Sequence, residues 1–518
     1  MTPAVIRCGE RSRSYYEVAE RAGKIASGLA GLGVQPGDRV AIVLRNEIEF
    51  VETSMAAGQL GAVPVPVNWH WKGSELGYLL DDCGAKAAFV HSDLVPVVRG
   101  ATDRSIPVIE VRLSDALVEA YRLPGGSVGS DKGADIELEM LVTTNAPPTT
   151  PAAGSPLSVI YSSGTTGQPK GVLRRPMTDD QRAAAANRIF LAFGLRPGMR
   201  TLIPAPLYHS APNAHALFSV AAGFDLTIMP RFTPREFLAT IERHGIQHTQ
   251  MVPTMFVRLL QLPDEERFSY DLSSLVSVVH AAAPCSPEVK RRMIDWWGPI
   301  ILEYYGGTES GCMVSCTSQE WLEHEGTVGR ALPGCDVKIV REDGSEAPTG
   351  ESGEVYLNPG AQWPDFTYIG NDEKRRSIDR DGYITLGDGG HLDEDGFLYI
   401  TDRLSDMVIS GGVNIYPVEI EKFLAGVSGV RDAAVFGIPD PEMGEILAAH
   451  VDTDPESGMT EDDIRAAVKQ GLAGYKVPRH VVIDRDLPRD ESGKLFKRKI
   501  RARYSNQTAL GTAASDGR

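Results

Sequence analysis

Short apolar runs rich in β-branched residues alternate along the chain with longer stretches of helical spacing. Runs of this kind, bounded by turn residues, are typical of buried strands. They lie at residues 40–44, 87–90, 157–162, 201–205, 225–229, 275–281 and 301–305. The stretches at 16–32 and 287–297 carry apolar residues at helical spacing. This alternation predicts an α/β fold of parallel sheets covered by helices, with ligands bound at the carboxyl ends of the strands.

From about Gly329 the apolar segments become shorter and turn signals become frequent, as in DRDGY at 379–383 and DEDGF at 393–397. This pattern predicts hairpins and a β-rich subdomain. After Asp406 it predicts helices at 417–425 and 460–471 and strands at 433–438 and 448–452, which suits a compact α+β domain. We therefore expect a large N-terminal domain over 1–404, consisting of helix-covered sheets plus the β-rich subdomain. A small C-terminal domain over 405–505 and a disordered tail over 506–518 complete the expected organisation.

The composition has 52 Lys and Arg against 69 Asp and Glu, a formal charge of −17. This balance argues against nucleic acid as a partner, because binding to it needs a basic surface. No stretch reaches the roughly 20 apolar residues of a transmembrane helix, and the first residues, MTPAVIRCGERSRSYY, lack the apolar core of a signal peptide. We therefore expect a soluble cytoplasmic protein with no transmembrane segment. The sequence leaves the oligomeric state open, a homodimer included.

The segment YSSGTTGQPKGV at 161–172 carries the strongest local signal of chemistry. A predicted strand leads into glycines, which let backbone N–H groups approach a phosphate closely, and into hydroxyl groups that add donors. Lys170 adds a positive charge. The Walker A pattern is absent, since the Gly493–Lys494 pair is followed by Leu495. The segment alone indicates either a phosphate-binding loop or a solvated turn.

Three further segments narrow the interpretation: YYGGTES at 304–310, the glycine- and aspartate-rich stretch at 383–421, and PRDESGK at 488–494. In this order and spacing, the four segments resemble the adenylate-forming superfamily of acyl-CoA synthetases, adenylation domains and luciferases. The resemblance covers about residues 13–503 and is closest to stand-alone fatty-acyl and aryl-CoA ligases. It implies that a small carboxylic acid attacks ATP in the presence of Mg²⁺, and that coenzyme A then takes the acyl group from the adenylate. AMP is a good leaving group, and phosphoryl chemistry needs positioning and charge neutralisation above all.

The resemblance implies a set of ATP-binding residues. The phosphate loop comprises Ser162, Ser163, Gly164, Thr165, Thr166, Gly167 and Lys170. Thr308 contacts phosphate and Glu309 holds Mg²⁺, a hard cation that prefers oxygen ligands. Adenine is enclosed by Tyr305 and the segment 280–284, which contains Ala282, Ala283 and Pro284, and Gly306 also belongs to the ATP-binding set. Asp388 accepts hydrogen bonds from the ribose hydroxyls, and Arg403 contacts the nucleotide.

The resemblance also implies that Lys494 is catalytic together with Thr308 and Glu309, because a lysine between carboxylate and α-phosphate stabilises the charge that develops there. The small domain is then mobile, with a hinge at Ser405 and Asp406 and a thiol tunnel lined by Gly411 and Gly412. Two hinge residues depart from the family pattern. Asp402 stands where glycine is usual, and Ser405 stands where aspartate or lysine is usual, so the behaviour of the hinge stays open.

We expect the acyl pocket to form around His209, Phe190, Tyr304, Gly306 and Gly307. The glycines leave a path beside the nucleotide, and the neighbouring candidates Phe193, Leu207, Phe218 and Met229 are apolar. In these segments only Asp225 could pair with the ammonium group of an amino acid. The prediction is therefore a hydrophobic medium- or long-chain fatty acid or an aryl acid, without a choice among them.

Two other functions remain to be weighed. A stand-alone amide synthetase or a carrier-protein loader would use the same adenylate with a different acceptor. A non-catalytic nucleotide-binding protein is disfavoured, because Lys494, Glu309 and Asp388 are all present.

Overall fold

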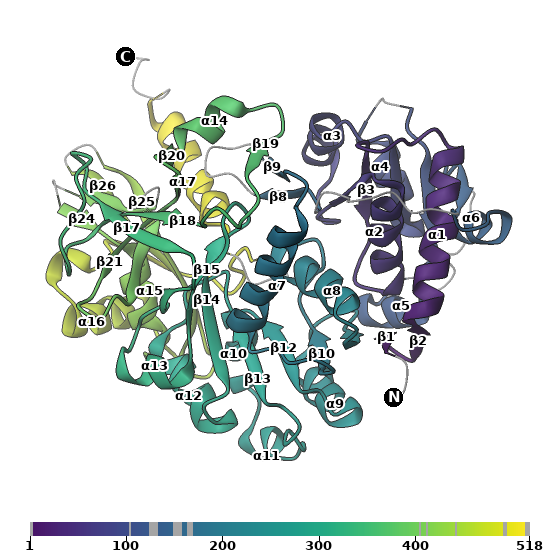
Figure 1. The fold of residues 1–518 in the computed structure, drawn as a ribbon. Helices are drawn as coiled ribbons and strands as arrows, with labels where there is room; N and C mark the ends of the chain where they lie inside the picture. The colour runs from purple at the N-terminus through teal and green to yellow at the C-terminus, as the bar shows by residue number, and fades with distance from the viewer. Residues whose placement is uncertain are drawn as a thin grey trace.

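The computed structural model describes residues 4–102, 105–123, 133–148, 158–162, 169–403, 406–410, 413–440, 443–489 and 495–512. A nine-stranded sheet lies at its centre, in the order β16-β15-β14-β13-β12-β10-β11-β1-β2 (Figure 1). Its strands are β1 (Val5–Cys8), β2 (Arg11–Ser14), β10 (Arg200–Ile203), β11 (Asp225–Ile228), β12 (His248–Met251), β13 (Ser277–His280), β14 (Ile301–Gly307), β15 (Gly311–Cys316) and β16 (Arg330–Ala331). The strands from β14 to β1 are parallel, whereas β15, β16 and β2 are antiparallel to their neighbours. This sheet confirms the predicted α/β class.

Helices cover both faces of the large sheet. Helices α7 (Asp179–Phe193) and α8 (Ser210–Ala221) lie on the face that carries Val279 and Leu302. Helices α9 (Pro234–His244), α10 (Pro253–Leu260) and α12 (Pro287–Trp297) lie on the face that carries Val278 and Ile301. The alternation of side chains along each strand separates these two apolar layers.

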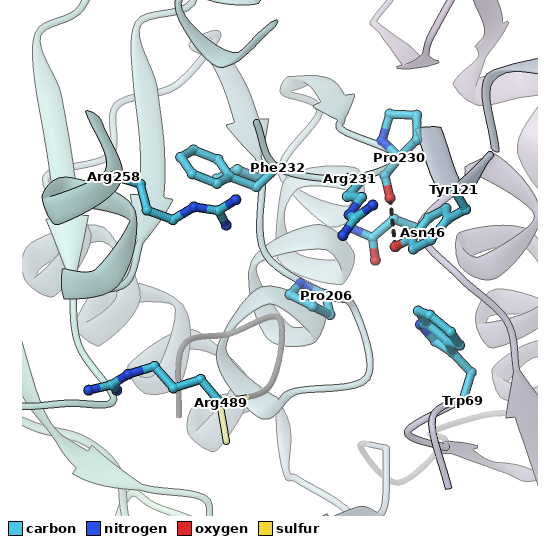
Figure 2. Close-up of a pocket in the computed structure, with 10 residues that line it drawn as sticks. Asn46, Trp69, Tyr121, Pro206, Pro230, Arg231, Phe232, Arg258 and Arg489 are labelled. Carbon is cyan, nitrogen blue, oxygen red and sulfur yellow. Dashed lines mark hydrogen bonds between the residues drawn. The ribbon is translucent and has the colours of Figure 1, made fainter. Parts of the chain in front are cut away.

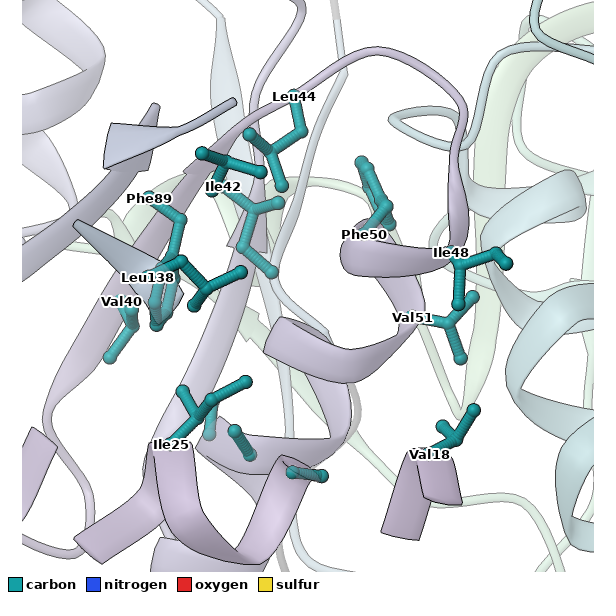
Figure 3. Packing of buried hydrophobic residues seen from close by; sticks show 14 of the residues in the cluster. Val18, Ile25, Val40, Ile42, Leu44, Ile48, Phe50, Val51, Phe89 and Leu138 are labelled. Atoms are coloured by element: carbon teal, nitrogen blue, oxygen red, sulfur yellow. The ribbon is translucent and has the colours of Figure 1, made fainter. Parts of the chain in front are cut away.

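A second sheet, in the order β4-β3-β5-β6-β7, is parallel throughout. Its strands are β3 (Arg39–Val43), β4 (Val63–Pro66), β5 (Ala87–His91), β6 (Val108–Val111) and β7 (Ile136–Glu137). The helices that cover it are α1 (Tyr15–Gly31), α2 (Ile48–Leu60) and α6 (Leu138–Thr144) on one face and α3 (Gly73–Asp82) and α4 (Val95–Arg99) on the other. Figure 3 shows Ile25, Phe50 and Leu138 from these helices packed around Ile42 and Phe89 of the strands.

The β-rich region predicted after Gly329 forms an antiparallel sheet in the order β17-β18-β21-β20, with β22 added to β21. Its strands are β17 (Asp336–Val340), β18 (Gly353–Asn358), β20 (Asp379–Arg380), β21 (Tyr383–Leu392) and β22 (Leu398–Arg403). A small antiparallel sheet of β8 (Ile160–Ser162), β9 (Lys170–Arg174) and β19 (Phe366–Tyr368) joins this region to the predicted phosphate loop. The shorter helices are α5 (Asp115–Tyr121), α11 (Asp264–Arg267), α13 (Ser318–Glu323), α14 (Asp372–Ser377), η1 (Ser92–Leu94) and η2 (Gly474–Lys476).

The residues from Val408 onward build a separate sheet in the order β24-β23-β26-β25, with β27 paired to β26. Its strands are β23 (Val408–Ser410), β24 (Val413–Ile415), β25 (Val430–Asp440), β26 (Gly444–Thr453) and β27 (His480–Ile483). Helices α15 (Pro417–Ala425) and α16 (Glu461–Gly471) match the helices that the sequence predicts here. Helix α17 (Lys497–Thr512) departs from the prediction, because it continues through 506–512, the first part of the expected disordered tail. Residues 506–512 contain no proline, so nothing in their backbone stops the preceding helix.

Among the residues that the structure covers, no helix is both long and apolar enough to span a bilayer.

A buried ion pair joins helix α12 to strand β14. The Nζ atom of Lys290 lies 2.6 Å from Oε2 of Glu303, and the two residues are only 0% and 6% exposed. Burial by itself would raise the pKa of Glu303, but Lys290 and His280 lower it overall. Glu303 is therefore a charged partner that keeps Lys290 satisfied inside the core.

We predict that Lys290→Met lowers the free energy of unfolding by about 3–5 kcal/mol, because it leaves the Glu303 carboxylate buried without its partner. The neighbouring Arg291→Met is a matched control. Arg291 has a 44% exposed side chain that pairs with Glu325 at the surface, and such pairs contribute less than about 1 kcal/mol. Thermal and urea unfolding would measure both variants. Equal stability of the two variants would show that the buried pair does not anchor α12.

Candidate active site

The reversal of the chain between β14 and β15 brings several predicted site residues to the carboxyl edge of the large sheet. Gly306 has φ of +156°, and a Cβ atom there would lie 1.9 Å from the carbonyl oxygen of Gly311. A Cβ on Gly307 would lie 3.0 Å from a side-chain carbon of Leu386. The close approach of β15 therefore requires glycine at 306. The glycine is thus needed for the packing of two strands, whereas the sequence suggested that it leaves an open path for the acyl group.

Arg174, at the end of β9, fixes the turn that follows. It is 8% exposed, and its guanidinium donates hydrogen bonds to the main-chain oxygens of Thr308 and Glu309, the latter over 3.0 Å. Its guanidinium carbon also lies 5.1 Å from the ring centre of Trp363. Burial lowers the pKa of Arg174 to about 10, although Glu309 opposes this shift. Arg174 therefore stays charged at neutral pH and orients Thr308 and Glu309.

The predicted metal ligand, Glu309, lies beside a tyrosine and near Lys170. The hydroxyl of Tyr368 donates to Oε1 of Glu309 over 3.0 Å. Burial and the nearby Lys374 lower the pKa of Lys170, whereas Glu309 raises it. In the part of the chain that the structure describes, no cluster of three acidic, histidine or cysteine side chains could enclose a metal. One carboxylate fits Mg²⁺ that takes its other ligands from ATP phosphates and water.

Three of the predicted nucleotide-binding residues lie next to one another. The hydroxyl of Tyr305 donates to Oδ2 of Asp388 over 2.8 Å, and Asp388 pairs in register with Arg403 on the adjacent strand β22. Ala282, in the predicted adenine segment, has φ of +73°. A non-glycine residue in this region is strained, and such strain often marks a ligand site.

The predicted acyl residues flank the same edge. Tyr304 stacks on Phe193 with ring centres 5.2 Å apart, and Phe190 lies edge-on to Phe218 at 5.2 Å. His209 is the N-cap residue of α8, and the hydroxyl of Thr308 donates to that of the next residue, Ser210, over 3.3 Å. The turn after β14 and the start of α8 are thus adjacent.

Asp225 lies at the opposite edge of the sheet, where β11 begins. Its carboxylate accepts a hydrogen bond from the main-chain N–H of Val5 over 3.1 Å and lies 3.5 Å from Arg7. It is therefore engaged away from Tyr304, as the prediction of an uncharged acyl pocket requires.

Several predicted residues lie outside the described residues, namely Ser163, Gly164, Thr165, Thr166, Gly167, Ser405, Gly411, Gly412 and Lys494. The side chains of Ser162 and Arg403 are not described either. Of the predicted hinge, Asp406 is described, and its carboxylate lies 3.6 Å from Arg501 of helix α17.

A cavity of about 230 Å³ adjoins the loop that leads to His209. It is lined by Arg231, Arg258 and Arg489, and Figure 2 shows these arginines around it, with Trp69 and Tyr121 on one side. Arg489 also contacts Asp432 over 2.6 Å. The cationic and aromatic lining suits an anion with a flat ring.

Asn46, which also lines this cavity, is a residue that the sequence does not single out. It is 5% exposed. Its amide donates to the main-chain oxygens of Ala205 and Met229 over 2.9 and 3.1 Å, and its Oδ1 accepts from the N–H of Leu207 over 2.8 Å. Asn46, which follows β3, thus ties the loop before His209 to the second sheet. Neither Asn46 nor Arg174 stands in a motif that would identify it.

We predict that Arg174→Met slows acid-dependent release of pyrophosphate from ATP by about 10- to 100-fold, because Thr308 and Glu309 lose the donor that orients them. Arg175→Met is the matched control, since the Arg175 side chain is 78% exposed and lies 3.8 Å from Asp365. Steady-state assays at saturating ATP would show the loss mainly in kcat. Equal rates for the two variants would contradict the positioning role of Arg174.

Comparisons with known proteins identify the family of the chain. The family model for AMP-binding enzymes matches residues 2–361, and the model for the AMP-binding enzyme C-terminal domain matches 419–494. The long-chain-fatty-acid–CoA ligase FadD13 of Mycobacterium tuberculosis is 33% identical over 495 residues, covering 95% of this chain and 93% of that protein. The feruloyl-CoA synthase of an Amycolatopsis species is 32% identical over 506 residues, covering 96% and 95%.

Among solved structures, the amide bond synthetase McbA from Marinactinospora thermotolerans superposes with a TM-score of 0.81 at 25% identity, covering 97% of each chain. The two family models and these relatives agree with one another. The chain belongs to the AMP-binding enzyme family, in its acyl-CoA synthetase branch, and is an AMP-forming ligase.

Proposed function

We propose that this ligase activates a hydrophobic fatty or aryl carboxylic acid with ATP and transfers the acyl group to coenzyme A. The observation that carries the proposal is the position of an apolar cluster directly beside the nucleotide residues. Phe193, Phe224 and Val279 are at most 3% exposed, and Phe190 and Tyr304 pack against them. Each methylene of an acyl chain buried among such residues contributes about 0.8 kcal/mol.

In the first step a carboxylate oxygen of the acid attacks the α-phosphorus of ATP, and pyrophosphate leaves. We assign ribose binding to Asp388, held by Tyr305, and phosphate binding to Lys170 and Thr308. Glu309 would hold Mg²⁺, which neutralises phosphate charge when bound. We assign Lys494 to the developing charge between the carboxylate and the α-phosphate.

In the second step the thiol of coenzyme A attacks the acyl carbon, and AMP leaves. We propose that the cavity lined by Arg231, Arg258 and Arg489 takes the phosphates of coenzyme A. Arg489 stands five residues before Lys494 in the sequence. The domain that carries Lys494 therefore also forms one side of the cavity. Rotation of the small domain after Ser405 would switch the enzyme from the adenylation step to the transfer step. Gly411 and Gly412 would then line the path of the thiol.

An amide synthetase that uses the same adenylate is the second candidate. The structural similarity to McbA favours it. The three arginines of the cavity favour coenzyme A, because arginine pairs well with phosphate groups and a neutral amine acceptor carries no negative charge. Acid-dependent release of AMP, measured with coenzyme A or with amines as acceptors, separates the two functions.

We predict that Lys494→Ala slows formation of the adenylate by roughly 100-fold or more, while preformed acyl-adenylate still reacts with coenzyme A near the normal rate. Only the first step develops charge between carboxylate and phosphate. Lys499→Ala, in the same basic stretch and exposed, should affect neither step. An equal loss of rate in both steps for the Lys494→Ala variant would rule out this assignment.

We predict that Arg258→Glu raises the KM for coenzyme A by about tenfold or more and leaves pyrophosphate release intact, because a negative charge then faces the acceptor phosphates. The control is Arg243→Glu, since the Arg243 side chain is 50% exposed on α9 and pairs with Glu236. An unchanged KM for coenzyme A would place its phosphates elsewhere.

A further inference from the structure

Buried polar side chains line a narrow zone beneath helices α7 and α8, next to the acyl cluster. Gln250 and His248 come from β12, Ser277 from β13 and His215 from α8. The amide of Gln250 donates to the hydroxyl of Tyr304 over 3.2 Å, and Nδ1 of His248 lies 3.1 Å from the hydroxyl of Ser277. We call Gln250, His215, His248 and Ser277 the polar column.

The column keeps several polar atoms without a hydrogen-bond partner among the residues that the structure covers. Within the described residues, no hydrogen bond of ordinary geometry reaches Oε1 of Gln250, either ring nitrogen of His215 or Nε2 of His248, although the Gln250 side chain lies close enough to His215 to raise its pKa. His215 and His248 are 0% exposed and Gln250 is 4% exposed. Buried polar atoms in proteins are nearly always paired, so a group of four unpaired ones in one place points to a ligand.

The imidazoles of the column are neutral. Burial lowers the pKa of His215 to about 3, with Gln250 opposing the shift. Burial and the nearby His215 lower the pKa of His248 well below 6.5. A neutral imidazole offers one donor and one acceptor, so the column suits an uncharged hydroxyl or carbonyl group rather than an ion.

The strand register places the column below the acyl entrance. Gln250 is paired with Val279, which is paired with Leu302, and Tyr304 lies two residues farther along β14 toward the carboxyl edge. His248 lies two residues deeper than Gln250. At about 3.3 Å per residue along a strand, Gln250 lies roughly 7 Å and His248 roughly 13 Å below the level of Tyr304. The side chains of Phe193, Val279 and Leu302, which lie on the same face of the sheet, are apolar.

We propose that the acid carries an uncharged hydroxyl or carbonyl group at the end remote from its carboxylate, and that Gln250 and His215 bind this group. The inference rests on the proposed function, since it specifies which acid the ligase activates. The apolar walls bind the body of the acid, and the column recognises its far end. Gln250 also holds Tyr304, which links recognition of the far end to the edge where the adenylate forms.

The test compares 3-(4-hydroxyphenyl)propanoate with 3-(4-methylphenyl)propanoate, two acids of nearly equal size, in the acid-dependent release of pyrophosphate. The full-length enzyme should favour the hydroxylated acid by about tenfold or more in kcat/KM. His215→Leu and Gln250→Leu should each bring this ratio close to one, whatever the change in the rate for the methyl acid. A role in folding alone would lower both rates together and leave the ratio unchanged.

Thr227→Val is the matched control. Thr227 on β11 is also buried, at 5% exposure, and its hydroxyl also lacks a hydrogen-bond partner in the described part of the chain, but it lies outside the column. This variant should keep the wild-type ratio, and thermal unfolding would verify that all three variants are folded.

Equal rates of the wild-type enzyme with the two acids would overturn the inference while leaving acid activation in place. The same holds if a preference persists in both leucine variants, because the hydroxyl is then bound elsewhere. The absence of pyrophosphate release with these acids and with a panel of unsubstituted fatty and aryl acids would overturn the proposed function itself, and the inference with it.

Discussion

The turn between β14 and β15 is the constraint on which the site depends. Gly306 lets the chain reverse against the carbonyl of Gly311, and the buried Arg174 binds the two carbonyls that follow. Tyr305, Thr308 and Glu309 all belong to this short segment, so one backbone geometry brings together the predicted adenosine contact, the predicted phosphate contact and the predicted metal ligand. A charged guanidinium on main-chain oxygens gives stronger hydrogen bonds than a neutral donor would.

Much of the fold could be predicted from local sequence. The predicted helices at 287–297 and 417–425 have the same ends in the structure, because each begins with proline and is followed by glycine. Strands β10, β11, β13 and β14 of the large sheet could be predicted because strands buried on both faces are often continuous apolar runs, whereas the polar β12 (HTQM) could not. Candidate nucleotide residues could be named because each stands in a contiguous motif. The structure brings Asp388 of β21 into contact with Tyr305 of β14.

The rest depends on contacts between distant parts of the chain. Arg174 binds a residue 134 positions away, and Asn46 binds one 161 positions away. No local pattern distinguishes these residues from an ordinary surface arginine or turn asparagine. The role of Gly306 was likewise hidden, because a glycine that admits a ligand and one that admits a neighbouring strand look the same in a sequence. The helix through 506–512 has a composition that suits a tail equally well, so local propensity could not decide between them.

Buried polar groups are paired on one face of the large sheet, whereas several are unpaired on the other face. On the α12 face, Lys290 and Glu303 satisfy each other, so their burial anchors a helix. On the α8 face, Oε1 of Gln250, Nε2 of His248 and the ring nitrogens of His215 have no such partners within the described protein, so the burial of these atoms opposes folding. An apolar lining of the same shape would be more stable and would bind any hydrophobic acid. A protein that keeps the less stable arrangement beside its acyl site gains discrimination, because a ligand that lacks the matching group leaves these atoms unpaired.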